Sequence, residues 1–203
     1  MIHSGGKSVL VATNQLDRIG GSETYTYALI EELKKRNFQV EYFTFKKGRI
    51  SDLIETVLKV PYKSKSKYDF IIASHQPCVR KLYRNGFIIQ VCHGIFPHLE
   101  QPSRFADYHI AISLEVEENL IRQGFPCRVI NNGINCQRFY PAKEINETLQ
   151  NVLSLCQSGS ANKIIKSICD RRNLNFIAIN KFENQVWEIE KAINDADLVI
   201  GLG

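Results

Sequence analysis

The chain has 203 residues and a formal net charge of +5, with hydrophobic and charged shares of 44% and 23% that are ordinary for a globular protein. No run approaches the roughly 20 apolar residues that a membrane span needs. No apolar stretch near the N-terminus resembles a secretory signal, and the six cysteines are widely scattered, so we expect reduced thiols in a cytoplasmic protein.

The first 45 residues have the pattern of a strand, a glycine turn, a helix and a second strand. Residues 8–13 and 39–45 are apolar runs, and an amphipathic helix follows Gly20 and Gly21. Free N–H groups and the helix dipole favour an anion at such a turn, and glycine lets a phosphate or sugar approach the backbone. Since a tight turn needs glycine regardless of ligand, the pair alone is a weak signal.

Strands and helices alternate along the rest of the chain. The strands predicted after the first unit span residues 69–74, 87–92, 108–113, 128–130, 152–156, 174–180 and 198–200. The predicted helices span residues 50–60, 78–84, 114–123, 162–172 and 184–196. The strands are continuous apolar runs, which is typical of parallel sheets covered on both faces. We therefore expect an α/β protein with a Rossmann-like domain at 1–135, a polar linker at 136–150 and a second α/β set at 151–203.

Polar groups follow several of the predicted strands. In an open parallel sheet, ligands bind outside the carboxyl ends of the strands, so these groups should converge on one edge with the glycine turn. A single histidine in such a place is as often structural as functional, but His75 and His93 each end a buried strand, which favours function. The strand-end residues concerned are Asn14, Ser74, His75, Gln76, His93, Gly94, Ser113, Asn132 and Gly133.

Three familiar motifs are incomplete or missing. Residues 4–8 have the composition of a P-loop, but the strand follows them rather than preceding them. There is no Gly-x-Ser-x-Gly elbow of a hydrolase. The Gly20-Gly21 pair lacks the three-glycine spacing of a dinucleotide site, so an NAD-binding fold is not supported.

Basic residues gather between positions 46 and 67. The set comprises Lys46, Lys47, Arg49, Lys59, Lys63, Lys65 and Lys67. A solvated loop is the commoner meaning of such a run. The alternative is peripheral docking on an anionic membrane, where each basic residue contributes roughly 1 kcal/mol. We expect no nucleic-acid binding, because no aromatic platform interleaves with these residues.

Five stretches of the chain resemble the nucleotide-sugar glycosyltransferases of family 4, which have the GT-B fold. The stretches are the turn at 20–23 with its helix, the strand end at 91–94, and residues 106–113, 128–135 and 138–141. This family has two Rossmann-like domains that face a cleft, the first binding the acceptor and the second the nucleotide-sugar donor. The resemblance implies sugar transfer with retention at the anomeric carbon, without a metal ion and without a cofactor other than the donor substrate.

The resemblance also implies roles for individual residues. His93 matches the histidine that contacts the transferred sugar and stabilises developing charge, so it is the expected catalytic residue. The acceptor side would be lined by Asn14, His75 and Gln76. The donor's diphosphate or sugar would be met by Gly20, Gly21, Lys163, Gly201 and Gly203.

The chain also departs from the family pattern. Residues 157–163 contain Lys163 but lack the family's diphosphate-binding arginine, and no acidic motif follows. The resemblance thus implies a donor domain cut roughly in half, with little transfer activity from these 203 residues alone. An unpaired strand edge would then favour self-association. The alternative function is a non-catalytic sugar-binding, nucleotide-binding or interaction module that retains the acceptor domain.

Overall fold

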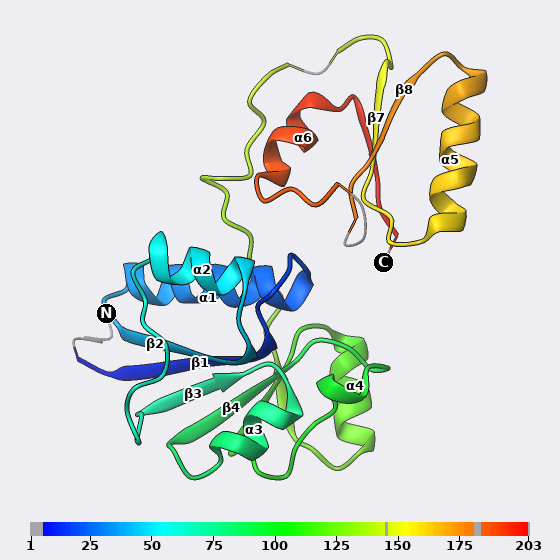
Figure 1. Ribbon diagram of the computed structural model, residues 1–203. Helices are drawn as coiled ribbons and strands as arrows, with labels where there is room; N and C mark the ends of the chain where they lie inside the picture. The colour runs from blue at the N-terminus through cyan, green and yellow to red at the C-terminus, as the bar shows by residue number, and fades with distance from the viewer. Residues whose placement is uncertain (1–5, 145, 181–183, 203) are drawn as a thin grey trace. The chain divides into compact units, whose positions relative to one another are not determined.

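The computed structural model describes residues 6–144, 146–180 and 184–202 (Figure 1). The chain forms two compact units, Met1–Asn132 and Gly133–Gly203. Each unit contains a parallel sheet with helices, so the expected α/β class is confirmed and both units are Rossmann-like in character.

The N-terminal unit is built on a sheet of six parallel strands in the order β2-β1-β3-β4-β5-β6. The strands are β1 (Ser8–Gln15), β2 (Gln39–Lys46), β3 (Phe70–Ala73), β4 (Phe87–Cys92), β5 (Tyr108–Ala111) and β6 (Cys127–Val129). The helices are α1 (Gly21–Lys35), α2 (Arg49–Thr56), α3 (Gln76–Leu82) and α4 (Leu114–Arg122), with a 3₁₀ turn, η1 (His98–Glu100). Figure 1 shows α1 and α2 on one face of this sheet and α3 and α4 on the other.

The core of this unit surrounds β1, the most deeply buried strand. Leu10 and Ala12 are fully buried and belong to a cluster that includes Val79 and Leu82 of α3. The residues that alternate with them, such as Val11, are also buried, because helices cover both faces of the sheet. The apolar runs in the sequence reflect this double burial.

Local signals fix where the helices begin and end. In α1, Glu23 lies in the first turn and Lys34 and Lys35 in the last, which suits the helix dipole. The helix ends before Asn37, whose φ of 63° is left-handed. No helix in the described ranges is both long and apolar enough to cross a bilayer.

The second unit has a sheet of three parallel strands in the order β8-β7-β9. Its elements are β7 (Asn151–Ser154), α5 (Gly159–Arg171), β8 (Asn175–Ala178), α6 (Ile189–Asp195) and β9 (Leu198–Ile200). Strands β8 and β9 form the edges of this sheet, and Ile177 on β8 is 56% exposed. Self-association through such an edge remains a prediction.

The segment predicted as a linker, residues 136–150, contacts α6 of the second unit. The Ala142 backbone N–H donates to Asn194 Oδ1 at 2.8 Å. Arg138 forms an ion pair with Glu190 at 2.9 Å and donates to the Trp187 carbonyl at 2.5 Å. Its described residues therefore belong to the second unit, consistent with a division after Asn132.

Two predicted helices are shorter than the sequence pattern suggested. Helix α2 ends at Thr56 rather than near residue 60, because Lys59 has a left-handed φ of 54°. Helix α6 begins at Ile189 rather than at 184, because Asn184 has a φ of 52° and its side chain donates to the Ala178 carbonyl. Asparagine favours such local turns over helix, because its side chain bonds to nearby backbone groups.

Candidate functional site

The order of the large sheet reverses between β1 and β3, since the chain runs outward from β1 to β2 and then returns to the other side of β1. In open α/β sheets, a ligand crevice forms at such a switch, outside the carboxyl ends of the strands. The end of β1 supplies Asn14 here, and the residues after β3 supply Ser74 and His75. The neighbouring strand β4 ends at Cys92, directly before His93. We call Tyr25, Ser74, His75 and His93 the histidine cluster.

His75 joins β1 to β3. Its Nδ1 accepts a hydrogen bond from the Asn14 backbone N–H at 3.1 Å, so the proton of the neutral ring is on Nε2. Thr13 Oγ1 also lies 3.1 Å from Nδ1. The residue is 5% exposed, and burial lowers the pKa of His75 to about 4. His75 is therefore neutral at physiological pH. Its Nδ1 is already hydrogen-bonded to β1, and this contact links β1 to the end of β3.

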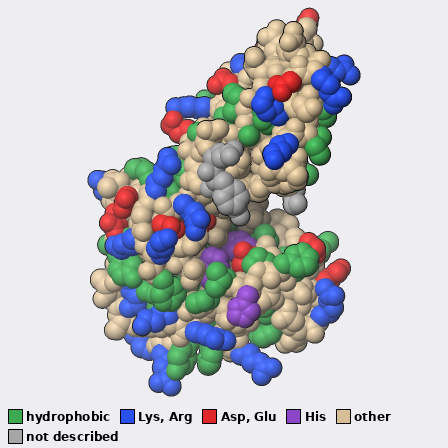
Figure 2. Space-filling model, turned by 45° about the vertical axis from the view of Figure 1, so that its right-hand side comes forward, with side chains coloured by type: hydrophobic (Ala, Val, Ile, Leu, Met, Phe, Trp, Pro, Cys, Tyr) green, Lys and Arg blue, Asp and Glu red, His purple; other side chains and the backbone are tan. Residues whose placement is uncertain are grey.

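His93 is more open than His75 and contacts two different elements. Its Nε2 lies 3.3 Å from Ser74 Oγ. Its ring meets the Tyr25 ring of α1 edge-on, with the centroids 4.6 Å apart. Burial lowers the pKa of His93 to about 4, and the nearby His75 acts in the same direction. The neutral ring can thus form hydrogen bonds with a ligand without carrying a charge. Histidine side chains are visible on the surface of this unit in Figure 2.

The Gly20-Gly21 loop begins α1, and Tyr25 follows one helical turn later. Because Tyr25 contacts His93, this loop lies at the same edge of the sheet as His93. The two glycines differ. A Cβ on Gly20 would lie 2.4 Å from Glu23 Oε2, whereas a Cβ on Gly21 would meet nothing within 4 Å. A side chain at position 20 would thus displace the end of the Glu23 side chain, whereas Gly21 leaves the backbone open to a ligand.

The Glu23 carboxylate changes the electrostatics of this turn. Glu23 is 4% exposed and accepts hydrogen bonds from Gln15 Nε2 at 3.2 Å and Ser22 Oγ at 3.3 Å. A carboxylate in the first turn offsets the positive end of the helix dipole, so it weakens the attraction for a second anion. The turn therefore suits a hydroxyl-bearing ligand better than a phosphate.

Three polar side chains around this edge have no hydrogen-bond partner within the described ranges. They are the Tyr25 hydroxyl, the Gln76 amide at the start of α3, and the Glu100 carboxylate. Glu100 covers Gly94, where an added Cβ would lie 2.7 Å from its Oε2, and burial raises the pKa of Glu100. The sequence pattern did not indicate a role for Glu100, and it placed Tyr25 on the apolar face of a helix.

Two of the predicted donor-side residues lie in the second unit. Gly201 follows β9 at the carboxyl edge of the small sheet, and a Cβ there would meet nothing within 4 Å. Lys163 is exposed and lies in α5, whose first residue follows the carboxyl end of β7. Gly203, the third predicted residue, lies outside the described residues.

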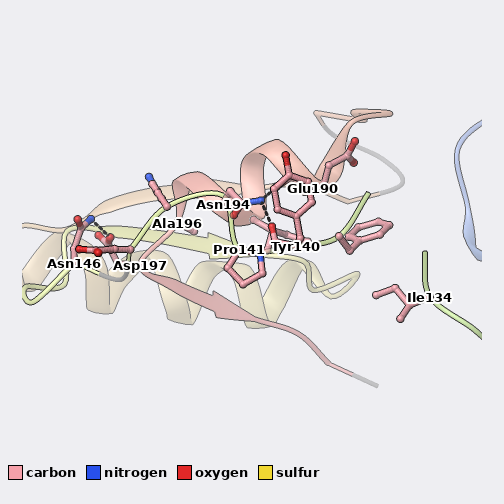
Figure 3. A pocket seen from close by; sticks show the side chains of 12 residues that line it. Ile134, Tyr140, Pro141, Asn146, Glu190, Asn194, Ala196 and Asp197 are labelled. Carbon is pink, nitrogen blue, oxygen red and sulfur yellow. Dashed lines mark hydrogen bonds between the residues drawn. The ribbon is translucent and has the colours of Figure 1, made fainter. Parts of the chain in front are cut away.

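A groove of about 490 Å³ in the second unit runs along α6 (Figure 3). Its walls are mostly apolar, including Ile134, Tyr140 and Pro141, and Asn194 donates to the Tyr140 carbonyl across it. Burial acts to raise the pKa of Glu190 at one end, but the hydrogen bond and charge of Arg138, a backbone hydrogen bond and the charge of Lys191 together lower it. The sequence did not predict this groove, because residues 136–150, which supply one wall, have the polar composition of a linker.

A second hollow, of about 390 Å³, lies in the N-terminal unit at the amino ends of β5 and β6. Tyr108 and Cys127, the first residues of these strands, line it. It therefore lies at the opposite edge of the sheet from the histidine cluster. In the described ranges no three His, Cys, Asp or Glu side chains are grouped so as to hold a metal ion.

In comparisons with known proteins, the sequence matches no family model and no curated protein. The chemistry that the histidine cluster could perform is therefore argued from the geometry of its own residues. Neutral imidazoles, a phenol, an amide and backbone N–H groups at one rim can donate to and accept from the hydroxyl groups of a sugar. A neutral His93 can also stabilise charge that develops on a bound sugar.

Proposed function

We propose that this protein is a retaining, metal-independent glycosyltransferase of the GT-B type, which transfers a sugar from a nucleotide-sugar donor to an acceptor. The observation that carries the proposal is the position of the neutral His93 ring at the carboxyl rim, in edge-on contact with Tyr25, which lies one helical turn after Gly21. In this role His93 contacts the transferred sugar and stabilises the charge at its anomeric centre.

The rest of the rim supports the same assignment. Asn14, Gln76 and the free nitrogen of His75 would bind acceptor hydroxyls. Gly21 leaves open backbone for the donor, and Lys163 and Gly201 would bind the donor's diphosphate from the second unit. Two Rossmann-like sheets in one chain are also what the GT-B fold requires.

The second candidate is a non-catalytic sugar-binding or nucleotide-binding module. It is favoured by the commitment of His75 Nδ1 to Asn14 and Thr13, and by the absence of an arginine from residues 157–163. Such a module would keep a ligand at the same rim but would leave the sugar bonded to its nucleotide.

The two candidates are separated by measuring binding and transfer on the N-terminal unit joined to a complete donor domain, because the resemblance implies little transfer from these 203 residues alone. Melting temperature is followed during titration with UDP, GDP, UDP-glucose and GDP-mannose, since a ligand that binds the native state raises it. Nucleoside diphosphate release in the presence of a glycan and lipid acceptor panel then reports transfer. Stabilisation with transfer supports the enzyme, and stabilisation without transfer supports the binding module. No stabilisation by any of these compounds would contradict both.

A further inference from the structure

The surface formed by the outer side of α3 and the loop at 96–105 combines basic and exposed apolar side chains, and we call it the α3 face. The stretch from 70 to 106 contains four basic residues and one acidic residue, Glu100. The basic residues are Arg80, Lys81, Arg84 and Arg104. Basic and hydrophobic side chains lie next to one another along the lower edge of this unit in Figure 2.

The four cations of the α3 face are free of acidic partners. None of them forms an ion pair with another residue in the described part of the chain. Arg80, Lys81 and Arg84 are exposed, and the opposite side of α3 is buried through Val79 and Leu82. The charges therefore point away from the core.

The same face exposes large apolar side chains. Phe96 is 87% exposed, Phe105 is 52% exposed and Leu99 is 41% exposed. The Phe105 ring lies 5.0 Å from the Tyr83 ring, and the Arg84 guanidinium lies 5.0 Å from the same Tyr83 ring. The aromatic and basic groups thus form one continuous surface, to which η1 adds Leu99.

The lysine-rich segment at 46–67 differs in this respect. Lys46 pairs with Asp17 at 2.6 Å, Lys47 with Glu55 at 2.7 Å, and Lys65 lies 3.9 Å from Glu41. Lys63 donates to the Lys65 carbonyl. Three of the seven basic residues in this segment therefore lie next to a carboxylate, whereas none of the four on the α3 face does in the described part of the chain.

We infer that the α3 face docks on an anionic phospholipid bilayer. Unpaired Arg and Lys side chains are attracted to the negative surface potential, and the contribution decays within a Debye length of the surface. Phenylalanine, leucine and tyrosine side chains next to them can enter the headgroup region. Nucleic acid shares the charge preference and can stack on exposed aromatic rings, but it does not account for the exposed aliphatic side chain of Leu99, which a bilayer can bury.

The test is co-flotation of the purified chain with vesicles of phosphatidylcholine alone or mixed with phosphatidylserine. We expect binding to the mixed vesicles that weakens with salt, and little binding to phosphatidylcholine. The triple variant Arg80→Gln, Lys81→Gln, Arg104→Gln should weaken this binding by about 100-fold. The matched variant Arg49→Gln, Lys59→Gln, Lys63→Gln removes the same charge and should change the binding by less than about 10-fold, because these residues lie on or near α2 and not on the α3 face.

The apolar contribution is tested separately with two phenylalanines of equal exposure. Phe105 and Phe45 are both 52% exposed, and only Phe105 lies on the α3 face. Phe105→Ser should weaken vesicle binding at least several-fold, and Phe45→Ser should leave it unchanged, with melting temperatures compared to confirm folding. Equal losses from the two triple variants, binding independent of phosphatidylserine, or tighter binding to a duplex RNA that displaces the vesicles would each overturn the inference.

Discussion

The ring of Tyr25 meets the ring of His93 edge-on, with the centroids 4.6 Å apart and the planes inclined by 74°. Tyr25 lies one turn into α1, and His93 follows β4, so this contact joins the glycine turn to the strand ends. His93 is held on its other side by Ser74, at 3.3 Å. The histidine that we assign to catalysis is therefore fixed between a helix and the end of β3.

The role of His93 is tested by its removal. Measured with the N-terminal unit joined to a complete donor domain, His93→Ala should lower kcat for sugar transfer by about 10²-fold or more, as expected for one aligned hydrogen-bonding group. His98→Ala is the control, because His98 is exposed on η1. An unchanged kcat in a folded His93→Ala protein would make His93 a structural residue.

Stability should depend on pH through the buried histidines. Their pKa values are about 4 in the folded protein against about 6.5 when unfolded, so between these values the unfolded state binds more protons. The contribution is fully present above about pH 6.5 and is lost as pH falls towards 4, at up to about 3 kcal/mol for His75.

The variant His75→Gln isolates this effect from the carboxylates that titrate at lower pH. Glutamine can accept the Asn14 N–H bond but does not titrate. Denaturation followed by circular dichroism at pH 7, 6 and 5 should show a shallower loss of stability in the variant. The same slope in both proteins would mean that burial does not perturb His75.

The two glycines of the turn should respond differently to a methyl group. Gly20→Ala forces the buried Glu23 carboxylate to move and should destabilise the protein by about 1–3 kcal/mol. Gly21→Ala adds a methyl group to open space in a helix and should be neutral or stabilising by up to about 1 kcal/mol. In a Glu23→Ala background the effect of Gly20→Ala should shrink, and equal effects at both positions would contradict this account.

The ion pair between Arg138 and Glu190 should stabilise the second unit. Arg138→Ala leaves the half-buried Glu190 unpaired and should lower the free energy of unfolding by about 1–3 kcal/mol. Trp187 is the chain's one tryptophan and lies 5.3 Å from Arg138, so its fluorescence reports this unit during urea unfolding. Lys191→Ala, which removes an exposed pair with Glu188, should leave stability nearly unchanged.

The sequence predicted the alternation of strands and helices because burial on both faces leaves continuous apolar runs. It also predicted that the strand-end residues lie together, because the carboxyl ends of parallel strands share one edge of the sheet. It did not predict that Tyr62 pairs with Tyr42 beside β2, because a single bridge leaves no repeating pattern. The early start assigned to α6 failed at Asn184, whose side chain stabilises a turn that helical periodicity does not reveal.

The details of the site depended on contacts between residues distant in sequence. Glu23 was visible as a helix residue, but its burial against Gly20 is a property of the folded turn. Glu100 reaches the His93 edge through η1, and the pairing of Lys65 with Glu41 neutralises charge that composition alone left free. These relationships depend on tertiary packing, which local propensity does not encode.

The most direct test of the account is nuclear magnetic resonance of the histidine rings during titration with the nucleotide sugar that stabilises the protein most. We predict that the His93 ring signals shift with ligand concentration and that those of His98, exposed on η1, and His109, bonded near Ser103 at the opposite edge of the sheet, stay in place. Ligand binding that leaves His93 unperturbed would contradict the central claim.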